Sequence, residues 1–122
     1  MPVQIKELAF VFHTTADVAK ARAFYGGFLG LKTGMDLEFA PGTWWTEYDI
    51  AGTALAVTNA IPMEGTKGAG LALEVPDLDA ALAAAKAEGI PVTLEPQEFG
   101  VCRMFIISSP DGYAITLHQR KA

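Results

Sequence analysis

The chain has 122 residues, of which 51% are hydrophobic, so we expect one folded domain over residues 1–122 rather than a disordered chain. Its net charge is −5 with scattered Lys and Arg, which excludes an extended basic surface for nucleic acid. The single cysteine, Cys102, excludes an internal disulfide and a Cys-x-x-Cys zinc site. No apolar run approaches the roughly 18 residues of a membrane span, and no secretory signal is visible at the N-terminus. A cytoplasmic protein is expected.

The first half of the chain, residues 1–62, predicts a strand, a helix and three more strands. Residues 8–14 are apolar and β-prone, as in a buried strand. Asp17 can then cap a helix over residues 18–28. The three further strands are expected at residues 31–39, 44–50 and 53–58, separated by turns at Pro41-Gly42 and Ala51-Gly52.

The second half, residues 63–122, repeats this order after a segment rich in Gly and Pro at residues 60–70. A strand is expected at residues 71–75 and a helix, capped by Asp77 and ended by Gly89, at residues 78–88. Strands at residues 91–95, 101–107 and 113–119 complete it. The two caps lie about half the chain apart, which indicates a duplicated unit. A single open α+β sheet with two similar helices is the alternative.

Four segments carry a family resemblance. They are residues 17–25 (DVAKARAFY), 28–31 (FLGL), 75–81 (VPDLDAA) and 109–117 (SPDGYAITL). In this order and spacing they resemble the vicinal oxygen chelate superfamily of glyoxalase I, bleomycin resistance proteins and extradiol dioxygenases. The resemblance implies an α+β fold with two tandem βαβββ modules, residues 1–62 and 63–122, in a curled mixed sheet around a cavity. It also implies a homodimer.

The resemblance further implies where metal ligands would lie. Metal-dependent members carry a His or Gln on the first strand, a His at the start of the second module and a Glu on the last strand. Counted from the helix caps, these positions fall on Phe10, Gly70 and Thr116. Phe and Gly have no side-chain donor, and a Thr hydroxyl is a poor substitute for a carboxylate. We therefore expect no metal and no cofactor; a divalent metal is the alternative.

Two candidate catalytic residues lie on expected strands. His118 is two residues from Thr116, so it shares a strand face with it and could act in acid–base chemistry. A rim histidine without a role is the alternative. Glu47 and Asp49 share a face with Trp45, where Glu47 could be a base or a ligand anchor. Solvated carboxylates on an edge strand are the alternative.

Further candidates, Thr116 among them, would bind the ligand. Phe10 and Trp45, with Phe39 and Phe105, could line an apolar cavity or belong to the core. Arg103 could bind a carboxylate or phosphate, or pair with Glu47 or Glu74. Cys102 is expected to be an inert core thiol, and His13 is expected to face the helix side or the strand end.

These features favour a small-molecule-binding protein of this superfamily that lacks the usual metal ligands. The alternative is a glyoxalase-like lyase, isomerase or dioxygenase with a relocated metal or acid–base site at His118, Glu47 and Arg103. A third hypothesis is metal-free acid–base catalysis by His118 and Glu47. The expected partners are a small molecule and a second copy of the chain.

Overall fold

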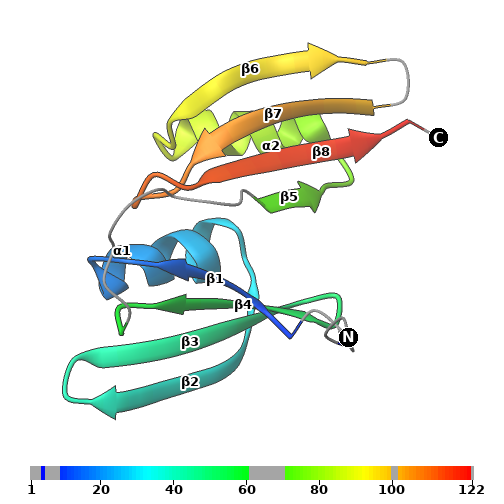
Figure 1. Ribbon diagram of the computed structural model, residues 1–122. Coiled ribbons are helices and arrows are strands. Elements are labelled where there is room, and N and C mark those ends of the chain that lie inside the picture. Colours follow the sequence, from blue (N-terminus) through cyan, green and yellow to red (C-terminus); the bar gives the residue numbers. More distant parts are fainter. Residues whose placement is uncertain (1–3, 5–8, 61–70, 100–101, 122) are drawn as a thin grey trace. The chain divides into compact units, whose positions relative to one another are not determined.

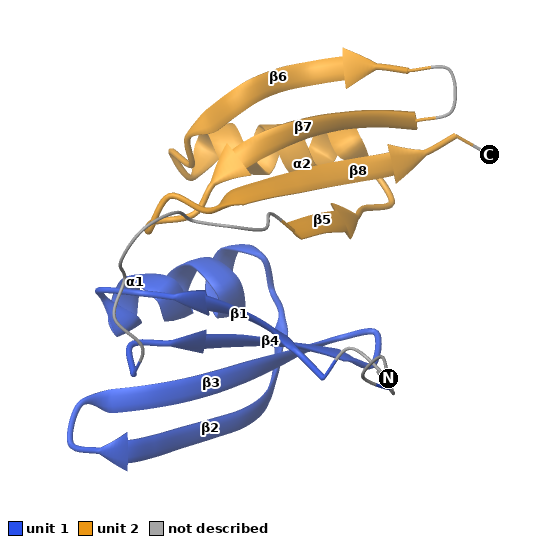
Figure 2. Cartoon of the chain, in the orientation of Figure 1, with its two compact units in different colours: residues 1–63 blue, residues 64–122 orange. Residues whose placement is uncertain are grey.

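The protein forms two units of similar construction. The computed structural model describes residues 4, 9–60, 71–99 and 102–121. These residues fall into two compact units, Met1–Met63 and Glu64–Ala122, which Figure 2 shows in blue and orange. In each unit a strand and a helix are followed by three strands (Figure 1).

The first unit is built on a four-stranded mixed sheet, the first sheet. Its strands lie in the order β1-β4-β3-β2, with β1 parallel to β4 and the other neighbours antiparallel. The bounds of its elements are β1 (Val11–Thr14), α1 (Val18–Arg22), the π-helical turn η1 (Ala23–Phe28), β2 (Lys32–Ala40), β3 (Thr43–Ile50) and β4 (Thr53–Thr58).

The second unit has the same topology in its own sheet, the second sheet. The strand order is β5-β8-β7-β6, and β5 is parallel to β8. Its elements are β5 (Leu71–Glu74), α2 (Leu78–Ala87), β6 (Val92–Glu98), β7 (Cys102–Ser108) and β8 (Ala114–Arg120).

The two helices begin and end in the same way. Asp17 and Asp77 both have extended backbone, and each carboxylate accepts a hydrogen bond from the backbone N–H three residues on, at 3.0 and 3.1 Å. Such caps satisfy an N–H group that has no partner within the helix. Beyond the helical segments Gly30 and Gly89 have φ of +64° and +68°, a conformation that favours glycine.

Each sheet buries one face under its own helix. In the first unit Tyr25 of η1 stacks on Tyr48 of β3, with ring centroids 6.0 Å apart, and Leu55 is 1% exposed. In the second unit Leu78 of α2, together with Phe105 and Ile115, has no exposed surface. The opposite face of each sheet is called here its helix-free face, because neighbouring side chains on a strand alternate between the two faces.

The predicted α+β fold with two βαβββ modules is confirmed, and neither sheet closes on itself. The helix expected over residues 18–28 is α-helical to Arg22 and then π-helical. The strand expected over residues 8–14 begins at Val11, and residues 5–8 lie outside the described residues. Within the described part of the chain, none of the helices is long and apolar enough to cross a membrane.

Candidate functional site

Strand β3 divides its side chains between the two faces of the first sheet as predicted. Thr46 and Tyr48 are buried on the helix side, at 4% and 3% exposure. Trp45 and Glu47, which alternate with them, lie on the helix-free face and are half-buried. The structure thus places both predicted residues on one face.

Aromatic side chains gather around Trp45. The ring of Phe10 meets it edge-on, with centroids 5.4 Å apart at 89°, and Phe39 lies at 6.5 Å. Phe12 lies 6.4 Å from Phe10. We call these four residues the aromatic face. Phe10, Phe12 and Phe39 are 40–58% exposed, a large unburied apolar area for one side of a small sheet.

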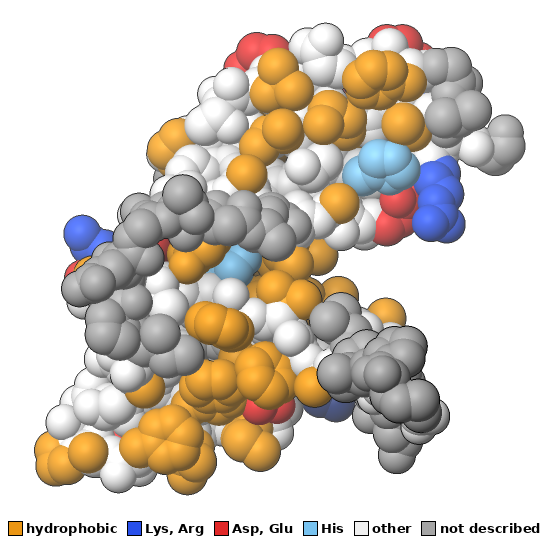
Figure 3. Space-filling model, in the orientation of Figure 1, with side chains coloured by type: hydrophobic (Ala, Val, Ile, Leu, Met, Phe, Trp, Pro, Cys, Tyr) orange, Lys and Arg blue, Asp and Glu red, His pale blue; other side chains and the backbone are white. Residues whose placement is uncertain are grey.

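Strand β2 extends this face with two aliphatic side chains that sequence reasoning missed. Leu37 and Met35 lie opposite Trp45 and Glu47 in the register, and both are exposed. Figure 3 shows hydrophobic side chains gathered over the first unit. The signal was in the sequence, because Met35, Leu37 and Phe39 alternate with polar residues, as on one face of a strand.

Glu47 is held at the aromatic face by its neighbour. The indole Nε1–H of Trp45 donates to Oε2 of Glu47 at 2.8 Å. Among the described residues, Oε1 of Glu47 makes no hydrogen bond. A carboxylate oxygen with remaining acceptor capacity lies beside exposed rings, which suits a ligand that has both an aromatic part and a donor.

An open pocket of about 500 Å³ lies next to Glu47, at the ends of β2, β3 and β4. Lys32 and Asp49, which are partners in the register of β2 and β3, both line it, and Oδ1 of Asp49 accepts the backbone N–H of Gly52 at 3.1 Å. The residues that line it are Lys32, Thr33, Gly34, Met35, Glu47, Tyr48, Asp49, Gly52 and Ala54.

In the second unit, Thr116 and His118 lie on the helix-free face. Ile115 and Leu117, which alternate with them along β8, are buried on the helix side. This agrees with the predicted alternation. Nδ1 of His118 is 2.6 Å from Oε1 of Glu74 on the neighbouring strand β5. Glu74 as the partner of His118 was not predicted, because the register of β5 on β8, two parallel strands with α2, β6 and β7 between them in the chain, cannot be read from sequence alone.

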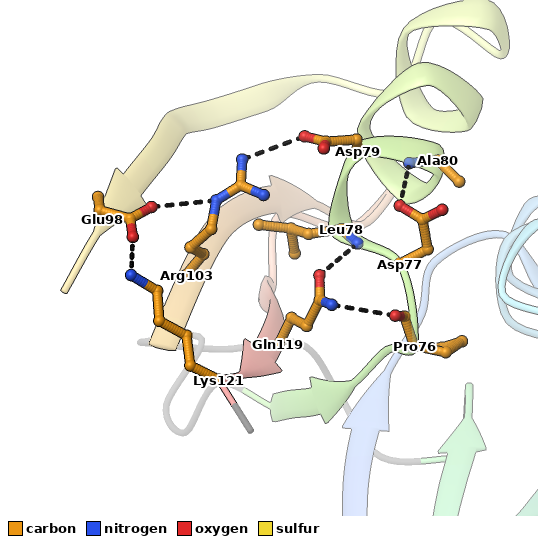
Figure 4. A network of polar contacts seen from close by, with 9 residues as sticks. All are labelled: Pro76, Asp77, Leu78, Asp79, Ala80, Glu98, Arg103, Gln119 and Lys121. Atoms are coloured by element: carbon orange, nitrogen blue, oxygen red, sulfur yellow. Dashed lines mark hydrogen bonds and ion pairs between the residues drawn. The ribbon is translucent and has the colours of Figure 1, made fainter. Parts of the chain in front are cut away.

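Arg103 and Phe105 lie on the helix side of the second sheet, where the structure agrees with the alternative interpretation of each, an ion pair for Arg103 and a core position for Phe105. Phe105 is fully buried in the core. Arg103 donates to Asp79 of α2 at 3.1 Å and pairs with Glu98 of β6 at 3.2 Å (Figure 4). The hydrogen bond to Asp79 raises the pKa of Arg103. Arg103 therefore forms an ion pair, which was the alternative to ligand binding, but its partners are not the expected Glu47 or Glu74.

Figure 4 also shows what surrounds this ion pair. Glu98 pairs in addition with Lys121. The side-chain amide of Gln119 accepts the backbone N–H of Leu78 at 2.8 Å and donates to the carbonyl of Pro76 at 3.0 Å. Gln119 thus holds β8 to the start of α2, while Arg103 holds β7 to α2 and β6, so Arg103 has a structural role.

The metal positions that the family implies do not fit a metal ion here. Phe10 is packed against Trp45, and Thr116 offers a neutral hydroxyl. Gly70 has no side chain and lies outside the described residues. Among the described residues, no three His, Cys, Asp or Glu side chains are grouped so that they could hold a metal ion. The carboxylate of Glu47 on β3 accepts the hydrogen bond from Trp45.

Two remaining candidates have structural positions. His13 is 1% exposed on the helix side, as predicted, and its Nδ1 lies 2.7 Å from the hydroxyl of Tyr25. Cys102 is a free, partly exposed thiol at the start of β7 rather than a core residue.

Comparison with known proteins agrees with this architecture. The family model of the Glyoxalase/Bleomycin resistance protein/Dioxygenase superfamily matches residues 7–117. No curated protein matches the sequence. Three solved structures illustrate the likeness.

The first is TnmS3, an antibiotic binding protein from Streptomyces sp. CB03234, with 26% identity, a TM-score of 0.79 and coverage of 98% of this chain and 100% of that one. The second is a glyoxalase family protein from Enterococcus faecalis, with 20% identity, a TM-score of 0.69 and coverage of 93% and 97%. The third is the fosfomycin resistance protein FosX from Listeria monocytogenes, with 16% identity, a TM-score of 0.77 and coverage of 97% and 96%.

The duplicated βαβββ topology, the capped helices and a family match over nearly the whole chain lead to one conclusion: the chain belongs to the glyoxalase/bleomycin resistance protein/dioxygenase superfamily.

Proposed function

We propose that the chain binds an aromatic small molecule without a metal ion, on the aromatic face of its first unit. The observation that carries this proposal is the exposure of several aromatic rings beside a fixed carboxylate, that of Glu47. Such an apolar surface is costly to leave in water, and a flat ligand that covers it is stabilised by stacking and by the hydrophobic effect. The likeness to TnmS3, an antibiotic binding protein, supports the proposal.

In this proposal each group has a stated role. Trp45 and Phe39 contact the faces or edges of the ligand's rings, and Phe10 and Phe12 enlarge the apolar surface. Glu47 anchors a donor group of the ligand, because Trp45 fixes its orientation in advance. The pocket beside Glu47 gives room for a substituent.

The experiment is a thermal-denaturation screen of the purified protein against a panel of aromatic compounds. A ligand that binds the native state raises the melting temperature, and a ligand at about a hundred times its Kd adds roughly 2.7 kcal/mol. We expect stabilisation by flat aromatic compounds in the wild type and its loss in Trp45→Ala. The control is Trp44→Ala, because Trp44 stacks on Arg22 on the helix side. No shift with any aromatic compound, or equal shifts in Trp45→Ala, would contradict the proposal.

The metal independence is tested separately. It is supported by the residue types at Phe10, Gly70 and Thr116. Ligand affinity is expected to be unchanged after treatment with a chelator. Stoichiometric zinc, nickel, manganese or iron in the purified protein, together with loss of binding on chelation, would instead support a glyoxalase-like lyase or dioxygenase.

The proposal has two further parts: the chain works as a homodimer, which rests on the family resemblance, and it works in the cytoplasm, as expected from the sequence. Light scattering at several protein concentrations tests the first, with a mass near 26 kDa expected, about twice the 13.0 kDa of one chain. Fractionation of cells that express the chain tests the second.

A further inference from the structure

Glu74 and His118 form a polar pair on the helix-free face of the second sheet. They lie opposite each other in the parallel register of β5 and β8, with Nδ1 of His118 2.6 Å from Oε1 of Glu74. The two side chains are 46% and 29% exposed, so a small molecule can reach the imidazole. The pair belongs to the second unit and has no part in the aromatic face described above.

The carboxylate of Glu74 is fixed at both oxygens. Oε2 accepts the backbone N–H of Arg120 at 2.7 Å, while Oε1 meets His118. The bond from Arg120 and then that from His118 lower the pKa of Glu74. Glu74 is therefore ionised at neutral pH, and an ionised carboxylate can only accept hydrogen bonds. It follows that Nδ1 of His118 carries the proton in this pair.

This tautomer leaves the other ring nitrogen, Nε2, as an acceptor. In a neutral imidazole one nitrogen donates and the other accepts. Within the described part of the chain, Nε2 of His118 has no hydrogen-bond partner. A histidine that a carboxylate orients through one nitrogen, and that exposes the other, is arranged to take a proton from a bound compound.

The neighbours of His118 limit what it can bind. Its register partner on β7 is Met104, which is uncharged and can pack against a ring. Among the described residues of these strands, the titratable groups on the same face are Glu74, Cys102 and Arg120, and Cys102 lies opposite Arg120. Arg120 also lies close enough to Glu74 for their charges to attract.

We propose that His118 and Glu74 form a second binding site, for compounds with an acidic hydroxyl group on an aromatic ring. The O–H bond of the phenol breaks, the proton forms an N–H bond with Nε2, and the electron pair stays on the phenolate oxygen. The phenolate is then paired with the imidazolium. Glu74 is a positioning residue, since it holds the ring and stabilises its positive charge. No oxidant, reductant or other reactant is needed.

The test uses para-nitrophenol, whose phenolate absorbs visible light, at a pH below the phenol's own pKa. We expect the intact wild-type chain to raise the phenolate absorption in a saturable way. His118→Ala should remove this signal, and Glu74→Gln should weaken the affinity about tenfold, because a neutral amide no longer stabilises the imidazolium. Para-nitroanisole, which has no hydroxyl proton, should not compete.

Control variants separate this site from the aromatic face. Lys86→Ala, which breaks an exposed ion pair between α2 and β6, should leave the phenolate signal unchanged. Trp45→Ala should also leave it unchanged. A phenolate signal that persists in folded His118→Ala, competition by para-nitroanisole, or loss of the signal in Trp45→Ala would each overturn the inference, and the last result would support the aromatic face instead.

Discussion

Trp45 donates its indole N–H to Oε2 of Glu47 at 2.8 Å, and this bond joins the largest ring of the aromatic face to a carboxylate. Both residues project from the same face of β3 because they are two positions apart. The bond orients the carboxylate before any ligand arrives, so less side-chain entropy is lost on binding. In the function proposed above, this pair selects among aromatic ligands.

The first prediction concerns this preference. An aromatic compound with a protonated amine should bind about tenfold more tightly than its uncharged analogue, because a charge-assisted hydrogen bond forms with Glu47. In Glu47→Gln, whose amide oxygen can still accept the bond from Trp45, this preference should disappear while the uncharged analogue binds as before. Calorimetric titration of both compounds measures it. Equal affinities of the two compounds for the wild type would contradict it.

Strand alternation explains which parts of the site could be predicted. Trp45, Glu47 and His118 were placed on the correct face because buried and exposed side chains alternate along β3 and β8. The same rule left the faces of Arg103 and Phe105 open, since β7 is apolar on both sides and its sequence does not show which face meets the helix.

Contacts between distant segments could not be predicted. Glu74 meets His118 because β5 is hydrogen-bonded to β8, although many residues separate them in sequence. The Asp79 and Glu98 partners of Arg103 come from a helix and an edge strand. Local patterns such as caps and turns carry information on the fold, whereas the partners of a charged side chain depend on tertiary packing.

The second prediction follows from the different positions of two phenylalanines. Phe105→Ala should lower the free energy of unfolding by about 3–5 kcal/mol, because it opens a cavity in the core. Phe39→Ala makes the same chemical change at a ring that is 58% exposed, so its cost should stay within about 0.5 kcal/mol while ligand binding on the aromatic face weakens. Denaturant unfolding and ligand titration of both variants measure this. Equal stability losses would contradict the assignment of the two faces.

The third prediction concerns the helix caps. Asp77→Ala should cost about 1 kcal/mol of unfolding free energy, since the N–H of Ala80 loses its acceptor. Asp77→Asn should cost much less, because its amide oxygen can still accept this bond. The same pair of variants at Asp17 should behave alike, as its carboxylate makes the equivalent bond to Lys20. If Asn costs as much as Ala at both positions, the carboxylate acts through its charge and not as a cap.

The last prediction uses the carboxylate that links α1 to the edge strand β2. The two carboxylate oxygens of Asp36 accept hydrogen bonds from Nη1 and Nη2 of Arg22, each at 2.9 Å, and Oδ1 also accepts the hydroxyl of Thr46 at 2.8 Å. The bond from Arg22 is the main cause that lowers the pKa of Asp36 below its usual value. A group with a lowered native pKa contributes stability above its unfolded pKa, and this stability is lost as the pH falls through the native pKa.

Asp36→Asn should therefore lower the free energy of unfolding by about 1 kcal/mol at neutral pH. This difference from the wild type should persist down to about pH 4, near the pKa of an unfolded Asp, and shrink at lower pH as Asp36 itself becomes protonated. Glu95→Gln is the control, because Glu95 pairs with Lys86 through two well-exposed side chains and such pairs contribute little. Denaturant unfolding at several pH values measures both variants. If the difference for Asp36→Asn stays constant far below pH 4, the ion pair with Arg22 is not the source of the stability that Asp36 provides. The reason is that protonated Asp36 can no longer pair as a carboxylate with the guanidinium.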